Sequence, residues 1–378
     1  MSLNCPQVVS KLKTYQKQHQ DLKQLFSDFM SQVPFLPDVK WDEPFMSSPY
    51  YKDITNAPKE IFDNLYDAKE EARKKLEELK DEVLPQIEKI INLKEQYNSQ
   101  VEVLTQSNIL EQLSNGEMGI RGVDGKEYPL PTYQEVLGRF TDQEKRTLLE
   151  KKVKQGFTKI LLVPFAMPLS VLIERYKEVL LKTHKETGIK STDDPIYVEE
   201  GLIQSDQLHN PQNTQMEYGV INYSLKTKKA RGGKYKSELL QDPDNAWQIN
   251  LVEEILDIPA QGQGKTISGR KQIEAGKSSK AFLKLLQTDL QYQGESSQVP
   301  EAAILEAVTA LNLEHVVIHD FENQGKVNWL ISNYLSGGSF VSRIPIISWN
   351  GLKNSLYFGL GNMDLKLLSN GFRPTVRF

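Results

Sequence analysis

Hydrophobic residues in the first quarter of the chain recur every three or four positions, which is the spacing of helices that bury one face. One such run ends before Pro34, and a longer run extends from about Pro58 to about Tyr97 with charged residues on its other faces. Pro85 lies inside the longer run, where a proline bends a helix. Residues 1–100 are therefore predicted to form a helical hairpin or coiled coil, either as an oligomerising stalk or as helices packed on the rest of the chain.

The pattern becomes mixed after residue 100. Asn115-Gly116 and Asp124-Gly125 are typical of hairpin turns, and a helix is expected to begin near Thr132. The run FTKILLV indicates a buried strand, an amphipathic helix follows it, and AWQINLVEEILDIPA indicates another strand. We therefore expect an α+β fold, with a mixed α/β segment over residues 101–244 and a further domain over residues 245–378.

The run IPIISWNGLKNSLYFGLGNMD, which begins at Ile344, shows neither a helical period nor a sustained alternation. It combines Trp349, Tyr357 and Phe358 with three asparagines and several glycines. This composition is typical of a surface loop used in recognition. The alternative is a glycine-rich β-meander whose aromatic residues belong to the core. The pattern alone leaves both interpretations open.

Charge is unevenly distributed along a chain of ordinary globular composition. The formal net charge of -4 gives no reason to expect non-specific nucleic-acid binding by the whole molecule. Residues 326–378, however, contain six basic residues and one acid, which is a local balance of +5. That basic and aromatic segment would suit an acidic ligand, unless its arginines are bonded within the fold. A second basic stretch, Ser224 to Lys236, surrounds a Gly-Gly pair and is predicted to be a solvated, mobile loop.

Several kinds of site and targeting signal find little support. Cys5 is the single cysteine, so one chain cannot form an intramolecular disulfide or a cysteine metal cluster. No apolar run has the length of a signal peptide or a membrane span. The expected location is cytoplasmic by default, with non-standard export or a virion destination left open.

Catalytic and nucleotide-binding motifs are also weak. The segment GQGKT ends like a phosphate-binding loop, but Pro259 stands where that motif needs a glycine. His315 and His319 would share a helical face with Asp320 nearby, yet we interpret them as polar residues at a helix end rather than as a metal site. No G-x-S-x-G motif occurs. We expect neither catalysis nor a cofactor.

Four segments of the second half occur in an order that is informative when they are read together. They are GQGKTISGRKQIEAGKSSKAFLKLLQTDLQYQGESSQVPEAAI, HVVIHD, QGKVNWLISNYLSGGSFVSRIPIISWNG and NGFRPTVRF. This order resembles the variable, or target, proteins of diversity-generating retroelements. NGEMGIRGVDGKEYPLPTYQEV and QGFTKILLVPFAMPL extend the likeness to about residues 101–378.

The resemblance implies a C-type-lectin-type domain of the formylglycine-generating-enzyme subgroup, made of twisted antiparallel strands with two flanking helices. Those helices would lie near Ser278–Leu286 and Pro300–Leu313, and Gly371-Phe372-Arg373 would be the terminal strand signature that fixes the sheet. Pro374-Thr375 departs from the small residue pair of the family, and the insert 340–343 lengthens a loop, so the register could shift by one or two residues. Enzymes of the subgroup use cysteines in this domain, so a chain with only Cys5 cannot generate formylglycine.

In that family a reverse transcriptase substitutes bases at template adenines, chiefly in asparagine codons, so that ligand-contacting positions vary on a constant scaffold. The resemblance implies one variable position upstream and a series around Trp349: Asn328, Ile346, Ser348, Asn350, Leu352, Asn354, Tyr357, Asn362 and Asp364. Trp349, Lys353 and Met363 cannot arise from an asparagine codon with a pyrimidine third base by changes at its adenines, so they are assigned to the scaffold.

The resulting hypothesis is a non-enzymatic ligand-binding protein with a hypervariable surface patch. Its ligand would be a protein or a cell-surface molecule, without specific nucleic-acid binding or a membrane span, and the N-terminal helices would provide any homo-oligomer contact. Two alternatives come from other classes. One is an enzyme with a cryptic site in the middle region, and the other is an assembly protein that acts through its coiled coil.

Overall fold

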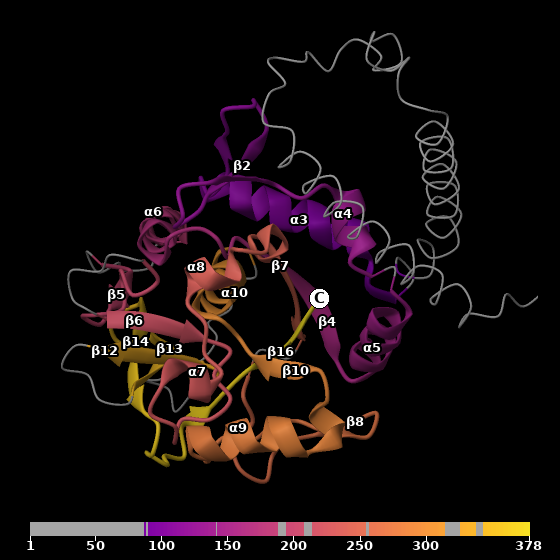
Figure 1. Cartoon of the computed structure of the whole chain (residues 1–378), viewed down its shortest axis with the longest axis vertical. Helices are drawn as coiled ribbons and strands as arrows, with labels where there is room; N and C mark the ends of the chain where they lie inside the picture. Colours follow the sequence, from indigo (N-terminus) through magenta and orange to yellow (C-terminus); the bar gives the residue numbers. More distant parts are fainter. Residues whose placement is uncertain are drawn as a thin grey trace, which may run out of the picture. The chain divides into compact units, whose positions relative to one another are not determined.

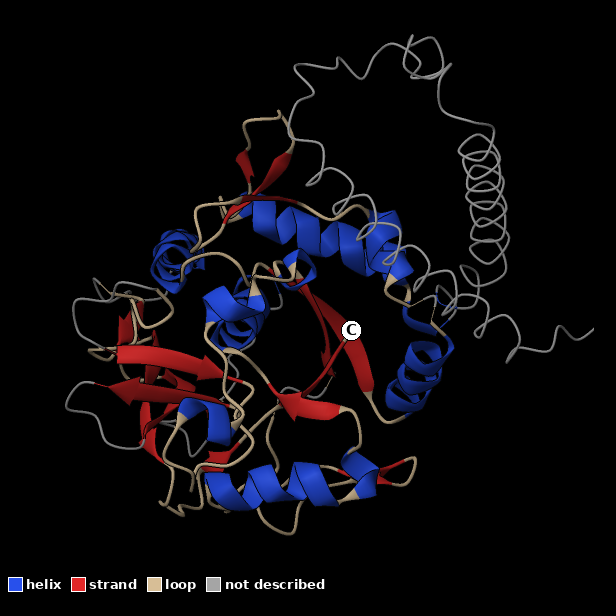
Figure 2. Cartoon of the chain, viewed as in Figure 1, coloured by secondary structure: helices blue, strands red, loops and turns tan. Residues whose placement is uncertain are grey.

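The computed structural model describes residues 87, 90–140, 142–187, 194–207, 214–254, 257–313, 326–337 and 343–378. All of them belong to one compact unit, Leu76–Phe378. The two histidines considered as metal ligands, Cys5 and nearly all of the predicted N-terminal helices lie outside the described residues. Within the described residues the fold is a mixed α+β arrangement of eight helices and mostly antiparallel sheets, as expected from the sequence (Figure 2).

The first described elements are a helix and a small meander. Helix α3 (Leu93–Gln106) precedes three short antiparallel strands, β1 (Glu111–Gln112), β2 (Met118–Arg121) and β3 (Glu127–Pro129). Both predicted glycine turns are present, because Gly116 and Gly125 have φ values of 85° and 76° that favour glycine. Helix α4 (Tyr133–Gly138) begins next to Thr132, as predicted, and Thr132 forms a capping box with Glu135; α5 (Gln143–Lys154) follows.

A four-stranded antiparallel sheet, ordered β10-β16-β7-β4, forms one layer. Its strands are β4 (Phe157–Val163), β7 (Gln248–Glu253), β10 (Glu295–Ser297) and β16 (Pro374–Arg377). The predicted buried strand and the second predicted strand are thus confirmed as β4 and β7, which pair with each other. Strand β4 comes from the segment 101–244 and its three partners from 245–378, so both segments build this sheet.

A second sheet contains strands ordered β15-β11-β13-β12-β6, and β14 pairs with both β13 and β5. The bounds are β5 (Ile196–Val198), β6 (Thr214–Tyr218), β11 (Val327–Trp329), β12 (Asn333–Gly337), β13 (Arg343–Asn350), β14 (Ser355–Asn362) and β15 (Asn370–Gly371). Figure 1 shows this sheet on the left of the view and the four-stranded sheet near its centre.

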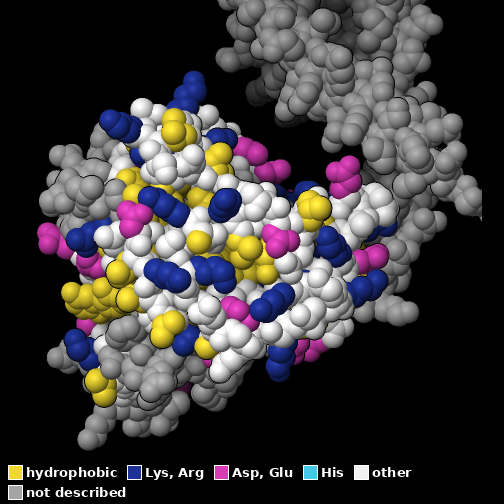
Figure 3. Space-filling view, turned by 90° about the horizontal axis from the view of Figure 1, so that it is seen from below, with side chains coloured by type: hydrophobic (Ala, Val, Ile, Leu, Met, Phe, Trp, Pro, Cys, Tyr) yellow, Lys and Arg dark blue, Asp and Glu magenta, His cyan; other side chains and the backbone are white. Residues whose placement is uncertain are grey.

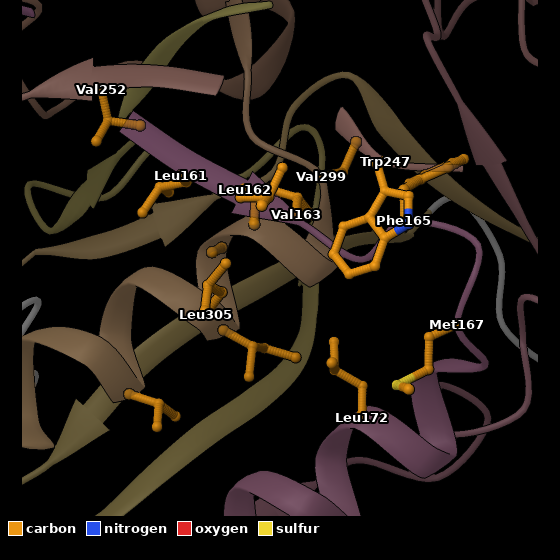
Figure 4. Packing of buried hydrophobic residues seen from close by; sticks show 14 of the residues in the cluster. Leu161, Leu162, Val163, Phe165, Met167, Leu172, Trp247, Val252, Val299 and Leu305 are labelled. Atoms are coloured by element: carbon orange, nitrogen blue, oxygen red, sulfur yellow. The ribbon is translucent and has the colours of Figure 1, made fainter. Parts of the chain in front are cut away.

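Helix α10 (Pro300–Leu313) contacts β4 of one sheet and β13 of the other, and it also packs on α6 (Leu169–Thr187). Leu305 of α10 faces Leu161 of β4 in the hydrophobic interior (Figure 4). The remaining elements are α7 (Lys228–Arg231), α8 (Lys236–Leu239), α9 (Ser279–Thr288), η3 (Pro243–Asn245), η4 (Leu290–Tyr292), β8 (Thr266–Ile267) and β9 (Arg270–Lys271). Among the described helices, none has the combination of length and hydropathy needed to cross a bilayer.

The aperiodic run near residue 344 is a β-hairpin, so its interpretation as a surface loop is wrong. β13 and β14 pair over eight residues each, from Arg343 opposite Asn362 to Asn350 opposite Ser355. The alternation is hidden because both faces of β13 are largely covered by protein, and a strand covered on both sides loses its polar positions. The core aromatics Trp349 and Phe358 agree with the alternative β interpretation.

The basic stretch from Ser224 to Lys236 is not simply a solvated loop. Arg231 is buried and forms an ion pair with Glu217. Lys236 is fully buried and its Nζ lies 2.6 Å from Asp206 and 2.7 Å from Glu301. The sequence-based interpretation fails here because the carboxylates that allow these cations to be buried come from distant parts of the chain.

Candidate functional site

The hairpin β13–β14 brings most of the predicted variable positions together. Ile346 lies opposite Gly359, Ser348 opposite Tyr357, and Asn350 opposite Ser355. Direct antiparallel partners and residues two apart share a face. Ile346, Ser348, Asn350 and Tyr357 therefore form one face, which we call the hairpin face. The opposite face carries Ile347, Trp349, Leu356 and Phe358 into the main hydrophobic core.

Tyr357 is held flat on the hairpin face by its neighbours. A Cβ added at Gly359 would lie 2.3 Å from the ring of Tyr357, so the ring occupies the space above that glycine. On its other side the ring stacks on Tyr197 of β5, with centroids 5.8 Å apart and planes 7° apart. Tyr197 remains 51% exposed. Two parallel aromatic rings therefore lie at the edge of the sheet, one of them open to solvent.

Glu199, just after β5, connects both strands of the hairpin. Its Oε2 accepts hydrogen bonds from Tyr357 Oη at 3.1 Å and from the Leu360 amide at 2.8 Å. Its Oε1 accepts one from Arg343 Nη1 at 3.0 Å. Burial, with the nearby charge of Glu199, raises the pKa of Tyr357 to about 12. Glu199 thus fixes the positions of a tyrosine and an arginine on this surface.

The contribution of β5 is missed by sequence reasoning. Tyr197 and Glu199 lie in a short segment, IYVEE, which was assigned to the mixed middle region. The one local signal is the alternation of buried Ile196 with exposed Tyr197, which is typical of a half-buried strand. Three residues are too few to identify a strand, and nothing local indicates that it pairs with β14.

The turn and the ends of the hairpin carry the other predicted positions. Leu352 is 82% exposed at the turn, and Asn354 adopts a left-handed conformation with φ of 46°. At the other end of the hairpin, Asn362 is exposed and accepts a hydrogen bond from the Asp364 amide, and Asp364 lies 2.7 Å from Lys280. The pairing span from 343 to 350 separates the two ends by about 23 Å.

Two predicted positions do not reach the surface. Asn328 is 1% exposed; its Nδ2 donates to Gln298 Oε1 at 2.8 Å and its Oδ1 accepts from the Arg373 amide at 2.9 Å. Ser348 is 3% exposed beside Tyr357. The remaining predicted residues are half-buried or exposed: Ile346, Asn350, Leu352, Asn354, Tyr357, Asn362 and Asp364.

The residues assigned to the scaffold lie inside, except Lys353, which is exposed at the turn of the hairpin. Trp349 is buried with its ring edge toward His184, at 6.1 Å between centroids. Phe372 packs on Phe282 in an edge-to-face arrangement, and Arg373 forms two hydrogen bonds with Glu306. An added Cβ at Gly371 would lie 2.6 Å from Ile258, which accounts for glycine at that position. Arg373 is therefore bonded within the fold. The sequence had left open whether the arginines of this segment are bonded in this way or available to a ligand.

The structure also has a mixed hydrophobic and basic surface and a cavity away from the hairpin. Figure 3 shows the face seen from below, where hydrophobic groups are interspersed with lysine and arginine side chains. A cavity of about 520 Å³ lies in the middle region between β3, α4 and β7. Its lining includes Tyr128, Glu135, Arg139, Asp244 and Trp247. Burial, and to a smaller extent the hydrogen bond and charge of Asp124, raise the pKa of Tyr128 to about 12.

Metal binding and similarity to other proteins give no further assignment. In the described parts of the chain, no group of three or more histidine, cysteine or acidic side chains is placed to hold a metal ion. Comparison of the chain with protein-family models, with curated proteins and with solved structures found no match.

Proposed function

We propose that this protein is a non-enzymatic binding protein whose variable surface is the hairpin β13–β14, diversified by a retroelement. The proposal starts from the sequence resemblance to retroelement variable proteins. It is supported by the way the hairpin separates two sets of residues. Seven of the nine positions implied to vary lie at least partly open on the hairpin face, its turn or its ends, and the scaffold residues Trp349 and Met363 are buried in the core, whereas Lys353 is exposed at the turn.

The observation that carries the proposal is the support of Tyr357. Its ring lies over Gly359 and stacks on Tyr197, and its hydroxyl donates a hydrogen bond to Glu199. Aromatic residues with little freedom are effective anchors in binding surfaces, because they lose little entropy on binding. The lectin-type assignment of the domain is part of the same proposal.

The proposed surface excludes Asn328, because its amide group serves two buried hydrogen bonds. Ser348 is also a poor contact position, since Tyr357 lies directly opposite and little of the serine is open. Substitutions at the exposed positions should usually change stability by less than about 0.5 kcal/mol, which is what repeated diversification requires.

The length of the surface favours a macromolecular ligand. Asn350 and Leu352 lie at one end of the hairpin, and Asn362 and Asp364 lie about 23 Å away at the other. A small molecule contacts only a part of such a span. A protein or a cell-surface glycan can contact both ends, and Leu352 and the Tyr197–Tyr357 pair provide apolar contact area between polar groups.

Two experiments test the proposal. The first reads the DNA beside the gene for a near-copy of its 3′ end that differs at adenines, and sequences the gene from many related isolates. Changes should concentrate at the seven open positions and spare Trp349 and Gly359. A gene without a near-copy, or changes spread evenly over the chain, would refute the retroelement origin.

The second experiment tests binding directly. An array of purified cell-surface proteins and glycans is probed with the full chain, with Leu352→Ser and with Leu290→Ser. Leu352 and Leu290 are almost equally exposed, at 82% and 81%, but only Leu352 lies on the hairpin. Loss of array signal with Leu352→Ser alone supports the proposal. Equal retention by both variants together with Tyr357→Ala contradicts it.

One specific observation favours the alternative of an enzyme, namely the cavity of about 520 Å³ in the middle region. Its volume lies within the range of small-molecule sites. The coiled-coil alternative concerns residues outside the described part of the chain, and comparing the solution mass of the full chain with that of a chain lacking residues 1–75 would test it.

A further inference from the structure

A polar cluster lies on the side of the four-stranded sheet that faces α10. Gln248 and Asn250 are two apart on β7 and therefore share a face with Val252. They are only 3% and 0% exposed, and none of their four amide nitrogen and oxygen atoms has a hydrogen-bond partner. Leu161, directly opposite Asn250 in the pairing of β4 with β7, is hydrophobic, and Leu305 of α10 lies toward Leu161 (Figure 4). Unpartnered amides in such surroundings are unfavourable unless another molecule supplies hydrogen bonds.

Arg377 of β16 joins this cluster from the adjacent strand. It lies directly opposite Asn250 in the antiparallel register, so the two side chains share a face. Their Cα atoms are about 5 Å apart, and Asn250 and Gln248 are separated by about 7 Å. Within the described residues, no hydrogen bond or ion pair engages the guanidinium of Arg377.

Arg377 is open to solvent, and the surrounding protein affects the pKa of its guanidinium. Its side chain is exposed to solvent, yet burial by the protein around it lowers the pKa of its guanidinium. The charge of Glu301 on α10 opposes that shift. Arg377 is therefore a cation that solvent can reach and whose charge is partly opposed by burial.

Glu301 of α10, whose charge acts on Arg377, adds an acceptor. Its Oε1 accepts from Lys236 Nζ at 2.7 Å and from Tyr218 Oη at 3.1 Å. Its Oε2 is buried and has no partner. The cluster therefore offers unfilled donors on Arg377 and the two amide nitrogens, and unfilled acceptors on the two amide oxygens and on Glu301.

We propose that Gln248, Asn250, Arg377 and Glu301 form an interior binding site for a small oxyanion that also carries hydroxyl groups. The anionic group binds the guanidinium of Arg377 and the amide nitrogens, and the hydroxyl groups donate to the amide oxygens and to Glu301 Oε2. A sugar acid and a sugar phosphate share this chemistry. The site is separate from the hairpin, so it stands or falls independently of the proposed surface.

The test is calorimetric titration of the full chain with gluconate and with glucose 6-phosphate, beside glucose, acetate and inorganic phosphate. Binding of gluconate or glucose 6-phosphate should exceed that of glucose and of the simple anions, and the better of the two probes identifies the carboxylate or the phosphate as the anionic group. If neither probe binds, ordered water alone satisfies these amides and the proposal fails.

Two variants and a control make the test specific. Arg377→Gln should weaken binding by at least about tenfold, because a charge-assisted hydrogen bond is lost. The control Arg121→Gln removes an exposed arginine that pairs with Glu111 and Glu127 on the small meander, and it should leave the titration unchanged. Equal binding by Arg377→Gln and the wild type overturns the assignment.

Asn250→Leu separates ligand binding from a structural role. Leucine has the same number of side-chain heavy atoms with the same branch at Cγ, and it removes an amide that has no partner, so the free variant should melt at a higher temperature than the wild type. The increase in melting temperature caused by the better probe should disappear in the same variant. A lower melting temperature without ligand, or an undiminished increase with ligand, contradicts the proposal.

Discussion

Replacing Glu199 with alanine removes the group that connects β5 to both strands of the hairpin. The Leu360 amide loses its acceptor in a residue that is only 9% exposed, which costs about 1–3 kcal/mol. The lost hydrogen bond from Tyr357 adds about 0.5–1.5 kcal/mol. The pair with Arg343 is partly exposed and contributes about 0–1 kcal/mol.

The expected decrease in the free energy of unfolding for Glu199→Ala is therefore about 1.5–5.5 kcal/mol, measured by urea denaturation. Glutamine keeps acceptor capacity at this position, so Glu199→Gln should lose only about 1 kcal/mol. The neighbouring Glu200 is exposed, and Glu200→Ala is the matched control, with an expected change below about 0.5 kcal/mol. If Glu199→Ala and Glu200→Ala have equal effects, the hydrogen bonds assigned to Glu199 do not stabilise the hairpin.

Three further predictions concern the same hairpin. Gly359→Ala should displace the Tyr357 ring and cost about 1–3 kcal/mol in urea denaturation, whereas an unchanged midpoint would show that the ring does not lie over this glycine. Trp349→Ala should cost about 3–5 kcal/mol and Leu352→Ser less than about 0.5 kcal/mol, and the reverse order would contradict the assignment of core and surface. Because its pKa is raised to about 12, Tyr357 contributes stability below pH 10 that is lost as pH rises toward 12; Tyr357→Phe should reduce this loss in thermal melts, and identical alkaline profiles would refute it.

The sequence predicted local elements well where the signals lie within a few residues of one another. The capping box at Thr132, the positive-φ glycines 116 and 125, and the apolar run of β4 each depend on near neighbours. The hairpin was harder to predict, because the alternation of polar and apolar residues disappears when both faces of β13 are covered. Its pairing depends on strands that a local pattern does not contain.

The candidate surface also combines features that the sequence indicated with features that depend on distant residues. Seven of the nine positions that the resemblance implies to vary lie in open or half-buried sites. The burial of Asn328 could not be predicted from the sequence, because its partners Gln298 and Arg373 lie 30 and 45 residues away. Tyr197 and Glu199 were missed for the same reason, since Glu199 reaches Tyr357 across 158 residues.

By itself, the sequence determined the elements whose caps, turns and apolar periods are local. Through the resemblance, it also indicated which residues of the last segment are implied to vary and which belong to the scaffold. Only the tertiary structure decided which charges are buried, as Lys236 and Arg373 are, and which polar groups remain without partners, as Asn250 does. The physical reason is that the free energy of a buried polar group depends on the atoms that surround it, and those atoms belong to distant parts of the chain.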